Sequence, residues 1–294
     1  MLPGLVAPPS NRQMFLALLT DFGLTDPYVG VMKSVILSVA PGATVVDLTH
    51  ELPPQDIRAG AFALRAAWPY LPPQAVVCAV VDPGVGTSRR PVALELGDEE
   101  TTRSLVCPDN GLAAALLDTA PVRAAVTLDN PAFHLPKVST TFHGRDLFAP
   151  VAAHLAAGRA LAEVGSPLAA TALAPLLWPQ PRRSDHGWEV TVLYQDRFGN
   201  LITNLPAGSL EPSANWRVVE LAKAGLSRSA RSAPLRATFA AVEPGEAVAY
   251  WGSSGYLELA IRNGSAAEDW NLGVGAELRV VKVELSRSAG DDRR

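Results

Sequence analysis

The first half of the chain alternates continuous apolar runs with stretches that carry apolar residues three and four positions apart. Apolar runs bounded by polar turns indicate buried strands, and the longer period indicates helices. We expect strands at 14–19, 43–48, 75–81, 91–96 and 104–106, and helices at 28–39, 56–68, 111–117 and 146–157. Asp56 is placed to cap the second helix. The alternation predicts an α/β domain with a mostly parallel sheet and flanking helices.

The pattern changes between residues 175 and 186, where proline and charged residues replace hydrophobic periodicity. Such a stretch is typical of an interdomain linker. We place a boundary near residue 180, with an α/β domain over 14–180 and a second domain over 187–285. In the second domain, short β-prone runs separated by Gly, Pro, Ser and Asn lie at 188–194, 216–222, 247–250, 256–261 and 277–284. These runs predict an all-β domain, either a barrel or a sandwich.

Composition and charge narrow the range of partners. The chain has 48% apolar and 18% charged residues, as ordinary folded proteins do. Its formal net charge is -4, and no stretch is rich enough in Lys and Arg to bind nucleic acid. The N-terminus lacks the pattern of a secretory signal, and no apolar run approaches the ~20 residues that cross a bilayer. We therefore expect a cytoplasmic protein with neither nucleic acid nor membrane as a partner.

Two segments place acidic residues directly after predicted strands. In TDFGLTDPYVG, Asp21 and Asp26 share a short loop, where a carboxylate can bind the hydroxyls of a ribose or simply cap the next helix. In VVDPGVGTSRR, Asp82 leads into a loop with two glycines, and Arg89 is placed to fold back onto its carboxylate. The glycines alone are a weak signal for phosphate binding, because the GxGxxG spacing fails and no Walker lysine follows.

Further segments carry other candidate polar groups. His143 precedes a glycine in STTFHGRDLFAP and could exchange protons near neutral pH, although a loop histidine bonded to backbone is a competing explanation. In YQDRFGNLITN, Asp196 and Asn200 are either turn formers or readers of an amino acid and a base edge. The chain has no HExxH, paired CxxC or GxSxG motif. Their absence argues against a metal site and against a Ser-His-Asp hydrolase.

Taken in order, seven segments resemble the S-adenosylmethionine (SAM) hydroxide adenosyltransferases. They are TDFGLTDPYVG, DLTHELPPQDIRAGAF, VDPGVGTSRRPV, PDNG, TFHGRDLFAP, DRFGNLITN and SGYLELAIRNGSAA, and the similarity spans roughly residues 14–283. The resemblance implies an α/β N-terminal domain and a β-barrel C-terminal domain. It also implies a homotrimer whose active sites lie between the N-terminal domain of one subunit and the C-terminal domain of its neighbour. No cofactor is expected, because SAM itself is the substrate.

The resemblance also assigns site residues. The family's hydrolytic Asp-Arg-His set falls on Asp82, Arg89 and His143. Asp21 is expected at the ribose hydroxyls and Asp196 at the methionine ammonium. The other substrate-binding residues that the resemblance implies are Asp26, Thr141, Phe142, Phe198, Asn200, Ser253 and Tyr256.

The implied reaction is hydrolysis of SAM to adenosine and L-methionine by attack of water or hydroxide on ribose C5′. Related enzymes that attack SAM with halide carry an uncharged residue in place of Asp82 and an arginine in place of Ser254, whose role is therefore not assigned. An anionic Asp82 repels halide but accepts a hydrogen bond from water. Two alternatives stay open, a halide adenosyltransferase and a sensor that binds SAM or adenosine without turnover. Whether Asp82 or His143 takes the proton is also open.

Overall fold

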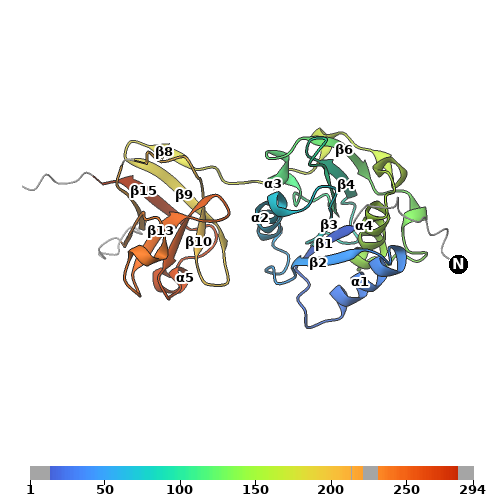
Figure 1. Ribbon diagram of the computed structural model, residues 1–294, viewed down its shortest axis with the longest axis horizontal. Coiled ribbons are helices and arrows are strands. Elements are labelled where there is room, and N and C mark those ends of the chain that lie inside the picture. The colour runs from blue at the N-terminus through green and yellow to red at the C-terminus, as the bar shows by residue number, and fades with distance from the viewer. Residues whose placement is uncertain (1–13, 213, 221–230, 284–294) are drawn as a thin grey trace, which may run out of the picture. The chain divides into compact units, whose positions relative to one another are not determined.

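The structure, a computed structural model, describes residues 14–212, 214–220 and 231–283. The chain divides into two compact units, Met1–Trp178 and Pro179–Arg294 (Figure 1). Each unit has its own sheet and its own hydrophobic core. The ends of two predicted strands, at residues 221, 222 and 284, lie outside the described residues.

Unit 1 is built on a seven-stranded sheet with the order β2-β1-β3-β5-β4-β6-β7. Its strands are β1 (Phe15–Thr20), β2 (Thr44–Thr49), β3 (Val76–Val80), β4 (Pro91–Leu96), β5 (Arg103–Pro108), β6 (Val122–Thr127) and β7 (Ser166–Pro167). β2, β1, β3 and β5 are parallel, whereas β4, β6 and β7 are antiparallel to their neighbours. β4 and β5 pair antiparallel because only a short turn joins them. The predicted α/β domain is confirmed, and its sheet is mixed.

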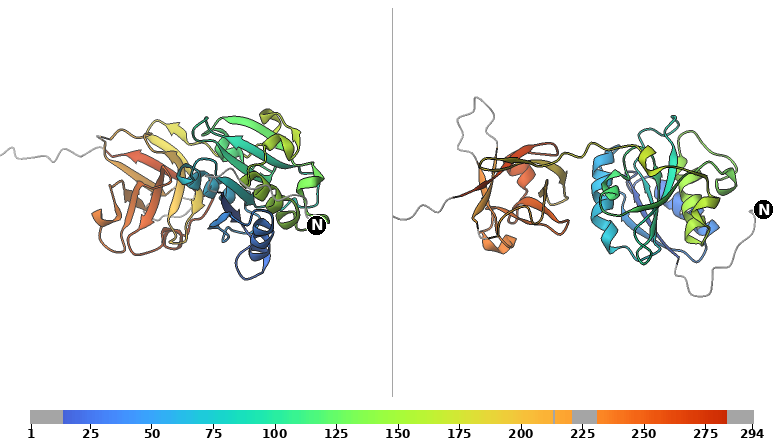
Figure 2. Two further views of the ribbon diagram at one scale, coloured as in Figure 1. Left: turned by 45° about the vertical axis from the view of Figure 1, so that its right-hand side comes forward. Right: turned by 90° about the horizontal axis from the view of Figure 1, so that it is seen from above.

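Helices cover both faces of this sheet (Figure 2). The α-helices are α1 (Tyr28–Val39), α2 (Ile57–Ala67), α3 (Ala114–Leu117) and α4 (Ala149–Ala156). α1 and α4 pack against each other and share a core with β1 and β3, and α2 packs against α3. The Asp56 carboxylate accepts a hydrogen bond from Ala59 N at 2.9 Å, so the predicted cap of α2 is confirmed.

Short helical turns complete unit 1. The 3₁₀ turns are η1 (Trp68–Tyr70), η2 (Pro131–Phe133), η4 (Leu161–Glu163) and η5 (Ala170–Ala172). A π-helical turn, η3 (Gly144–Phe148), leads directly into α4 and begins immediately after His143. The helix predicted at 146–157 is thus a π turn followed by an α-helix. Within the described residues, no helix has the length and apolar character that crossing a membrane requires.

Unit 2 is an antiparallel, barrel-like sheet with the order β12-β11-β15-β9-β10-β14-β13, and β8 pairs with β9. The strands are β8 (Arg182–Ser184), β9 (Gly187–Gln195), β10 (Leu201–Pro206), β11 (Trp216–Glu220), β12 (Ser232–Pro234), β13 (Ala247–Trp251), β14 (Tyr256–Ile261) and β15 (Glu277–Lys282). A bridge between Leu235 and Ala249 nearly closes the sheet. The unit also contains η6 (Phe239–Ala241) and α5 (Ala266–Trp270). The predicted barrel-like domain is confirmed, whereas β8, β10, β12, η6 and α5 were not predicted.

Candidate active site

Asp21 and Asp82 lie at the same edge of the sheet in unit 1. β1 and β3 are parallel neighbours with Thr20 paired to Val80, and each acid follows its strand within two residues. The carboxyl ends of parallel strands form the ligand-binding edge of an open α/β sheet. Both acids line one cavity of about 380 Å³, together with Phe22, Tyr28, Pro54, Gln55, Pro83 and Val85.

Arg89 connects Asp82 to His143. Its Nε donates to Asp82 Oδ1 at 2.9 Å and to Oδ2 at 3.1 Å, and its Nη2 also donates to Oδ2. The same Nη2 donates to His143 Nδ1 at 2.8 Å. The side chains of Arg89 and Asp82 are only 9% and 5% exposed, so solvent screens this ion pair little. The expected contact between Arg89 and Asp82 is confirmed, and the structure brings all three residues together.

The bond from Arg89 fixes the protonation of His143. A guanidinium can only donate, so His143 Nδ1 is an unprotonated acceptor and the single ring proton lies on Nε2. Burial, together with the positive charge of Arg89, lowers the pKa of His143 and favours this neutral ring. Protonation at Nδ1 would break the bond from Arg89.

The loops that carry these residues touch each other closely. Gly86 has φ +79°, and a Cβ at this position would lie 2.5 Å from the carbonyl oxygen of Thr140. Only glycine therefore fits where the loop after β3 meets the loop before His143. The buried Asp146 holds that second loop, because its carboxylate accepts from Ser139 N at 2.7 Å and pairs with the neighbouring arginine.

A buried hydrogen-bonded cluster fixes the backbone around Asp21. Thr20 Oγ1 lies 2.7 Å from His50 Nδ1 and accepts from Phe22 N at 3.2 Å. Gln55 N donates to Asp21 Oδ2 at 2.7 Å. Gln55 has φ +66°, an uncommon conformation for a residue with a side chain, and such strain is often found at functional sites. The Asp21 carboxylate is thus held in place at the wall of the cavity.

Aromatic rings line this cavity and a second one. Phe22, Tyr28 and Phe142 contact one another edge to face, with ring centroids 6.1, 5.9 and 5.3 Å apart. The second cavity has a volume of about 360 Å³ and is lined by Phe22, Tyr28, Ser139, Thr141, Phe142 and Arg145. The Arg145 guanidinium lies 4.9 Å from the Phe142 ring centroid, a cation–π contact. Two residues predicted from the sequence, at 141 and 142, thus line this second cavity.

In unit 2, Asp196 organises the turn between β9 and β10. Its Oδ1 accepts from Phe198 N at 2.9 Å and from Asn200 N at 2.8 Å, and its Oδ2 accepts from Asn200 Nδ2 at 2.7 Å. Asp196 and Asn200 are thus turn formers, which is one of the two explanations that the sequence left open. Asn200 is 7% exposed, whereas Phe198 is 76% exposed. The turn therefore presents an aromatic ring to the surface of unit 2.

A second turn of unit 2 carries Ser253. This residue is exposed between β13 and β14, and Tyr256 begins β14 as a buried side chain. Glu258 packs against the same turn with only 8% exposure. Its carboxyl accepts from the Tyr250 hydroxyl at 2.7 Å and from Ser254 Oγ at 3.3 Å. The predicted residues of unit 2 therefore lie in two turns and at the start of one strand.

Sequence reasoning missed Gln55, Arg145 and Glu258. Gln55 belongs to DLTHELPPQDIRAGAF, a segment that carried part of the resemblance but received no role. Glu258 is a single charged residue in the otherwise apolar strand YLELAI, which is a signal for a functional or paired carboxyl. Asp26 was predicted to bind substrate, but it is exposed and lines neither cavity of unit 1.

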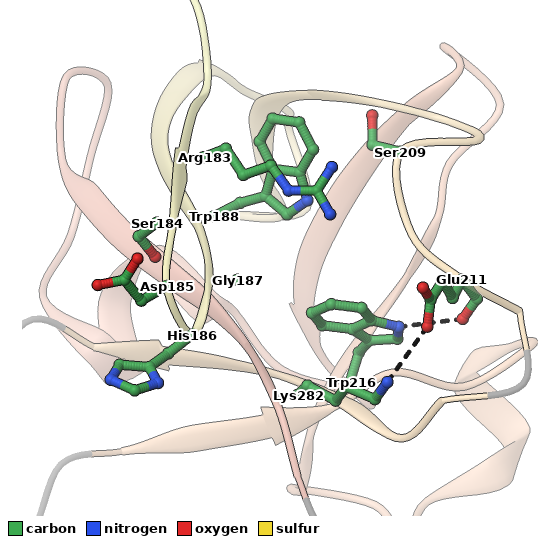
Figure 3. A pocket seen from close by; sticks show the side chains of 10 residues that line it. All are labelled: Arg183, Ser184, Asp185, His186, Gly187, Trp188, Ser209, Glu211, Trp216 and Lys282. Carbon is green, nitrogen blue, oxygen red and sulfur yellow. Dashed lines mark hydrogen bonds and ion pairs between the residues drawn. The ribbon is translucent and has the colours of Figure 1, made fainter.

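The remaining described residues provide no metal site but form one further cavity. Among residues 14–212, 214–220 and 231–283, no group of three His, Cys, Asp or Glu side chains could hold a metal ion. A third cavity of about 420 Å³ lies in unit 2 beside β9, β11 and β15 (Figure 3). In its lining, Lys282 pairs with Glu211 at 3.2 Å, and Arg183 stacks 5.6 Å from the Trp188 ring centroid. None of the residues predicted from the sequence lies in this cavity.

Comparisons with known proteins match both units. The SAM hydroxide adenosyltransferase N-terminal domain matches residues 16–165, and the C-terminal domain of the same family matches residues 190–279. The chain is 46% identical to the (R)-S-adenosyl-L-methionine hydrolase of Thermus thermophilus, over 90% of this chain and 98% of that protein. It is 42% identical to the hydrolase of the same name from Salinispora tropica, over 90% and 97% of the two chains.

A more distant relative and a solved structure also match most of the chain. A fluorinase from Actinoplanes sp. is 30% identical to the chain, over 94% of this chain and 100% of the fluorinase. The crystal structure of an uncharacterized conserved protein from Thermotoga maritima superposes with a TM-score of 0.79 at 33% identity, covering 90% of this chain and 99% of that one. Matches of this extent in both units show that the chain belongs to the SAM hydroxide adenosyltransferase family.

Proposed function

We propose that this protein hydrolyses S-adenosyl-L-methionine to adenosine and L-methionine. The observation that carries the proposal is the Asp82 carboxylate, which Arg89 holds at the wall of the cavity that also contains Asp21. The relatives at 46% and 42% identity are named (R)-S-adenosyl-L-methionine hydrolases, and they support the same reaction here. The sulfonium of SAM carries three different substituents and is a stereocentre. Because the names of these relatives specify the (R) configuration, we extend the proposal to the (R)-sulfonium epimer as the substrate.

In the proposed mechanism, water attacks ribose C5′ in line with the C5′–S bond. The new O–C5′ bond forms as the C5′–S bond breaks, and the electron pair of the broken bond returns to sulfur. Methionine then leaves as a neutral thioether without needing a proton. In this proposal the proton lost by the water goes to Asp82, because its carboxylate keeps a free lone pair beside the bonds from Arg89, whereas Arg89 occupies the single acceptor atom of His143. Alignment of water with C5′ can lower the barrier by about 7–11 kcal/mol.

The other site residues are proposed to bind the substrate. Asp21 accepts hydrogen bonds from the ribose hydroxyls, and Asp196 binds the methionine ammonium. Contacts to the adenine and methionine parts come from Asp26, Thr141, Phe142, Phe198, Asn200, Ser253 and Tyr256. We further propose a homotrimer in which unit 1 of one subunit and unit 2 of its neighbour form each site. The protein is proposed to act in the cytoplasm without a cofactor or a metal, and without a nucleic acid or membrane partner.

A product analysis tests the proposed reaction. The purified protein is incubated with the separated (R) and (S) sulfonium epimers in halide-free buffer made with ¹⁸O-water, and the nucleosides are analysed by mass spectrometry. Adenosine with ¹⁸O at the 5′ position, formed faster from the (R) epimer, is the expected product. Intact SAM together with measurable binding would instead favour a sensor without turnover.

A halide adenosyltransferase is the second candidate, because a fluorinase is among the relatives. The Asp82 carboxylate argues against it, because its negative charge would repel a halide ion in the same cavity. Addition of chloride or fluoride distinguishes the two reactions. The proposed hydrolase continues to form adenosine, whereas a halide transferase forms the 5′-halo-5′-deoxyadenosine.

A further inference from the structure

Glu258 is a buried carboxyl that the proposed mechanism does not use. Leu257 and Leu259 on either side of it belong to the core of the barrel, so Glu258 lies on the opposite face of β14. It is nevertheless only 8% exposed. Among the described residues, the groups that bond to or act electrostatically on its carboxyl are the Tyr250 and Ser254 hydroxyls and the negatively charged Asp196. A buried carboxylate without a cationic partner is costly, which makes Glu258 a candidate for a functional role.

The turn that carries Ser253 rests directly on this carboxyl. A Cβ at Gly252 would lie 1.8 Å from Glu258 Oε1, so the backbone at the start of the turn covers the carboxyl group. Ser254 donates to the same oxygen at 3.3 Å, and the Tyr250 hydroxyl donates to Oε2 at 2.7 Å. Glu258 therefore fixes the geometry of the turn through contacts on both of its oxygens.

Glu258 also lies near the turn that carries Asp196. In the sheet, Glu258 lies opposite Ile202 of β10, and Ile202 lies opposite Tyr194 of β9. Tyr194 precedes Asp196 by two residues. Burial raises the pKa of Glu258, the negative charge of Asp196 raises it further, and the hydrogen bonds from Tyr250 and Ser254 oppose this shift. Two carboxyl groups with only neutral donors beside them form a region where a positively charged ligand is favoured.

We propose that Glu258 is a positioning residue whose negative charge makes this part of unit 2 prefer a cationic ligand to a neutral ligand of the same shape. The inference rests on the proposed function, in which SAM is bound here. SAM carries a sulfonium, an ammonium and a carboxylate, for a net charge of +1. Both products, adenosine and zwitterionic methionine, are neutral overall. Glu258 therefore favours the substrate over its products and over the thioether S-adenosylhomocysteine.

The test measures the dissociation constants of SAM and S-adenosylhomocysteine by calorimetry, in full-length protein made inactive by Asp82→Asn. Glu258→Gln keeps the size of the side chain and an acceptor for Tyr250 but removes the charge. We expect it to weaken SAM binding about tenfold and to change S-adenosylhomocysteine binding by less than about twofold. Glu277→Gln, which removes an exposed glutamate of β15, serves as the matched control and should change neither.

Equal losses for the two ligands would show a purely structural role, and no loss for either would show that the charge is not used; both results overturn the proposal. A second measurement needs no variant at position 258. SAM should bind more tightly as pH rises through the raised pKa of Glu258, while S-adenosylhomocysteine binding stays flat. The opposite pH dependence also overturns the proposal. Adenosine release by the wild type is recorded separately, so a failure of the proposed hydrolysis is distinguishable from a failure of this selectivity.

Discussion

Asp82 in unit 1 and Glu258 in unit 2 are both buried carboxyl groups, but their partners differ in charge. Arg89 donates to both oxygens of Asp82, whereas Glu258 accepts only from the neutral hydroxyls of Tyr250 and Ser254. A guanidinium compensates a buried negative charge, and neutral hydroxyls do so only in part. Arg89 thus compensates the charge of Asp82 before a ligand binds, whereas the charge of Glu258 is left to interact with the charge of the ligand.

The largest expected effect comes from removing the compensation at Asp82. Arg89→Gln takes away the cation that holds Asp82 and His143 together, and we expect kcat for adenosine formation to fall about 10³-fold. The measurement is kcat at saturating SAM, with circular dichroism to verify folding. Arg90→Gln is the matched control, because Arg90 pairs with Asp109 and does not contact the catalytic set. An equal loss of kcat in both variants would contradict a specific role for Arg89.

A smaller effect is expected from protonation of His143, whose ring accepts a hydrogen bond from Arg89. The neutral ring accepts the bond from Arg89, and the pKa of His143 is lowered from its ordinary value of 6.5. Lowering a histidine pKa extends the neutral form to more acidic solution. Therefore kcat should stay constant from about pH 8 to 6.5 and decline only below that value. A pH–rate profile checks this, and a decline that begins above pH 7 would be inconsistent with it.

The smallest expected effect concerns the neutral partners of Glu258. The Tyr250 hydroxyl stabilises the ionised carboxylate, so Tyr250→Phe should raise the pKa of Glu258 further. The midpoint of the pH dependence of SAM binding should then shift upward. Tyr70→Phe, at a tyrosine that is 79% exposed, is the control. A downward shift would mean that the hydroxyl does not stabilise the charged form.

Much of the fold was predictable because burial leaves a local pattern. β3 is buried along its whole length and reads as a continuous apolar run, and Asp56 caps α2 through a contact three residues away. Strand direction leaves no such pattern. β4 and β5 have mostly buried residues, as the parallel strand β3 does, and only the short turn between them indicates the antiparallel pairing.

Contacts of the candidate site could be predicted where the two residues lie close together in the sequence. Asp82 and Arg89 are seven residues apart in one glycine-containing loop, so their contact could be expected from the sequence. The contact between Arg89 and His143 spans 54 residues and depends on the packing of two loops. Likewise, nothing local reveals that Glu258 lies under the turn at Gly252. These features needed the tertiary structure.

The most direct test of the central claim compares the wild type with Asp82→Asn. The two quantities are the rate of adenosine formation from (R)-S-adenosyl-L-methionine and the dissociation constant for the same ligand. The account predicts that the wild type forms adenosine, that the variant is slower by about 10³-fold, and that the affinity changes by less than about threefold. Adenosine formation by the variant at close to the wild-type rate, or none by the wild type, would contradict it.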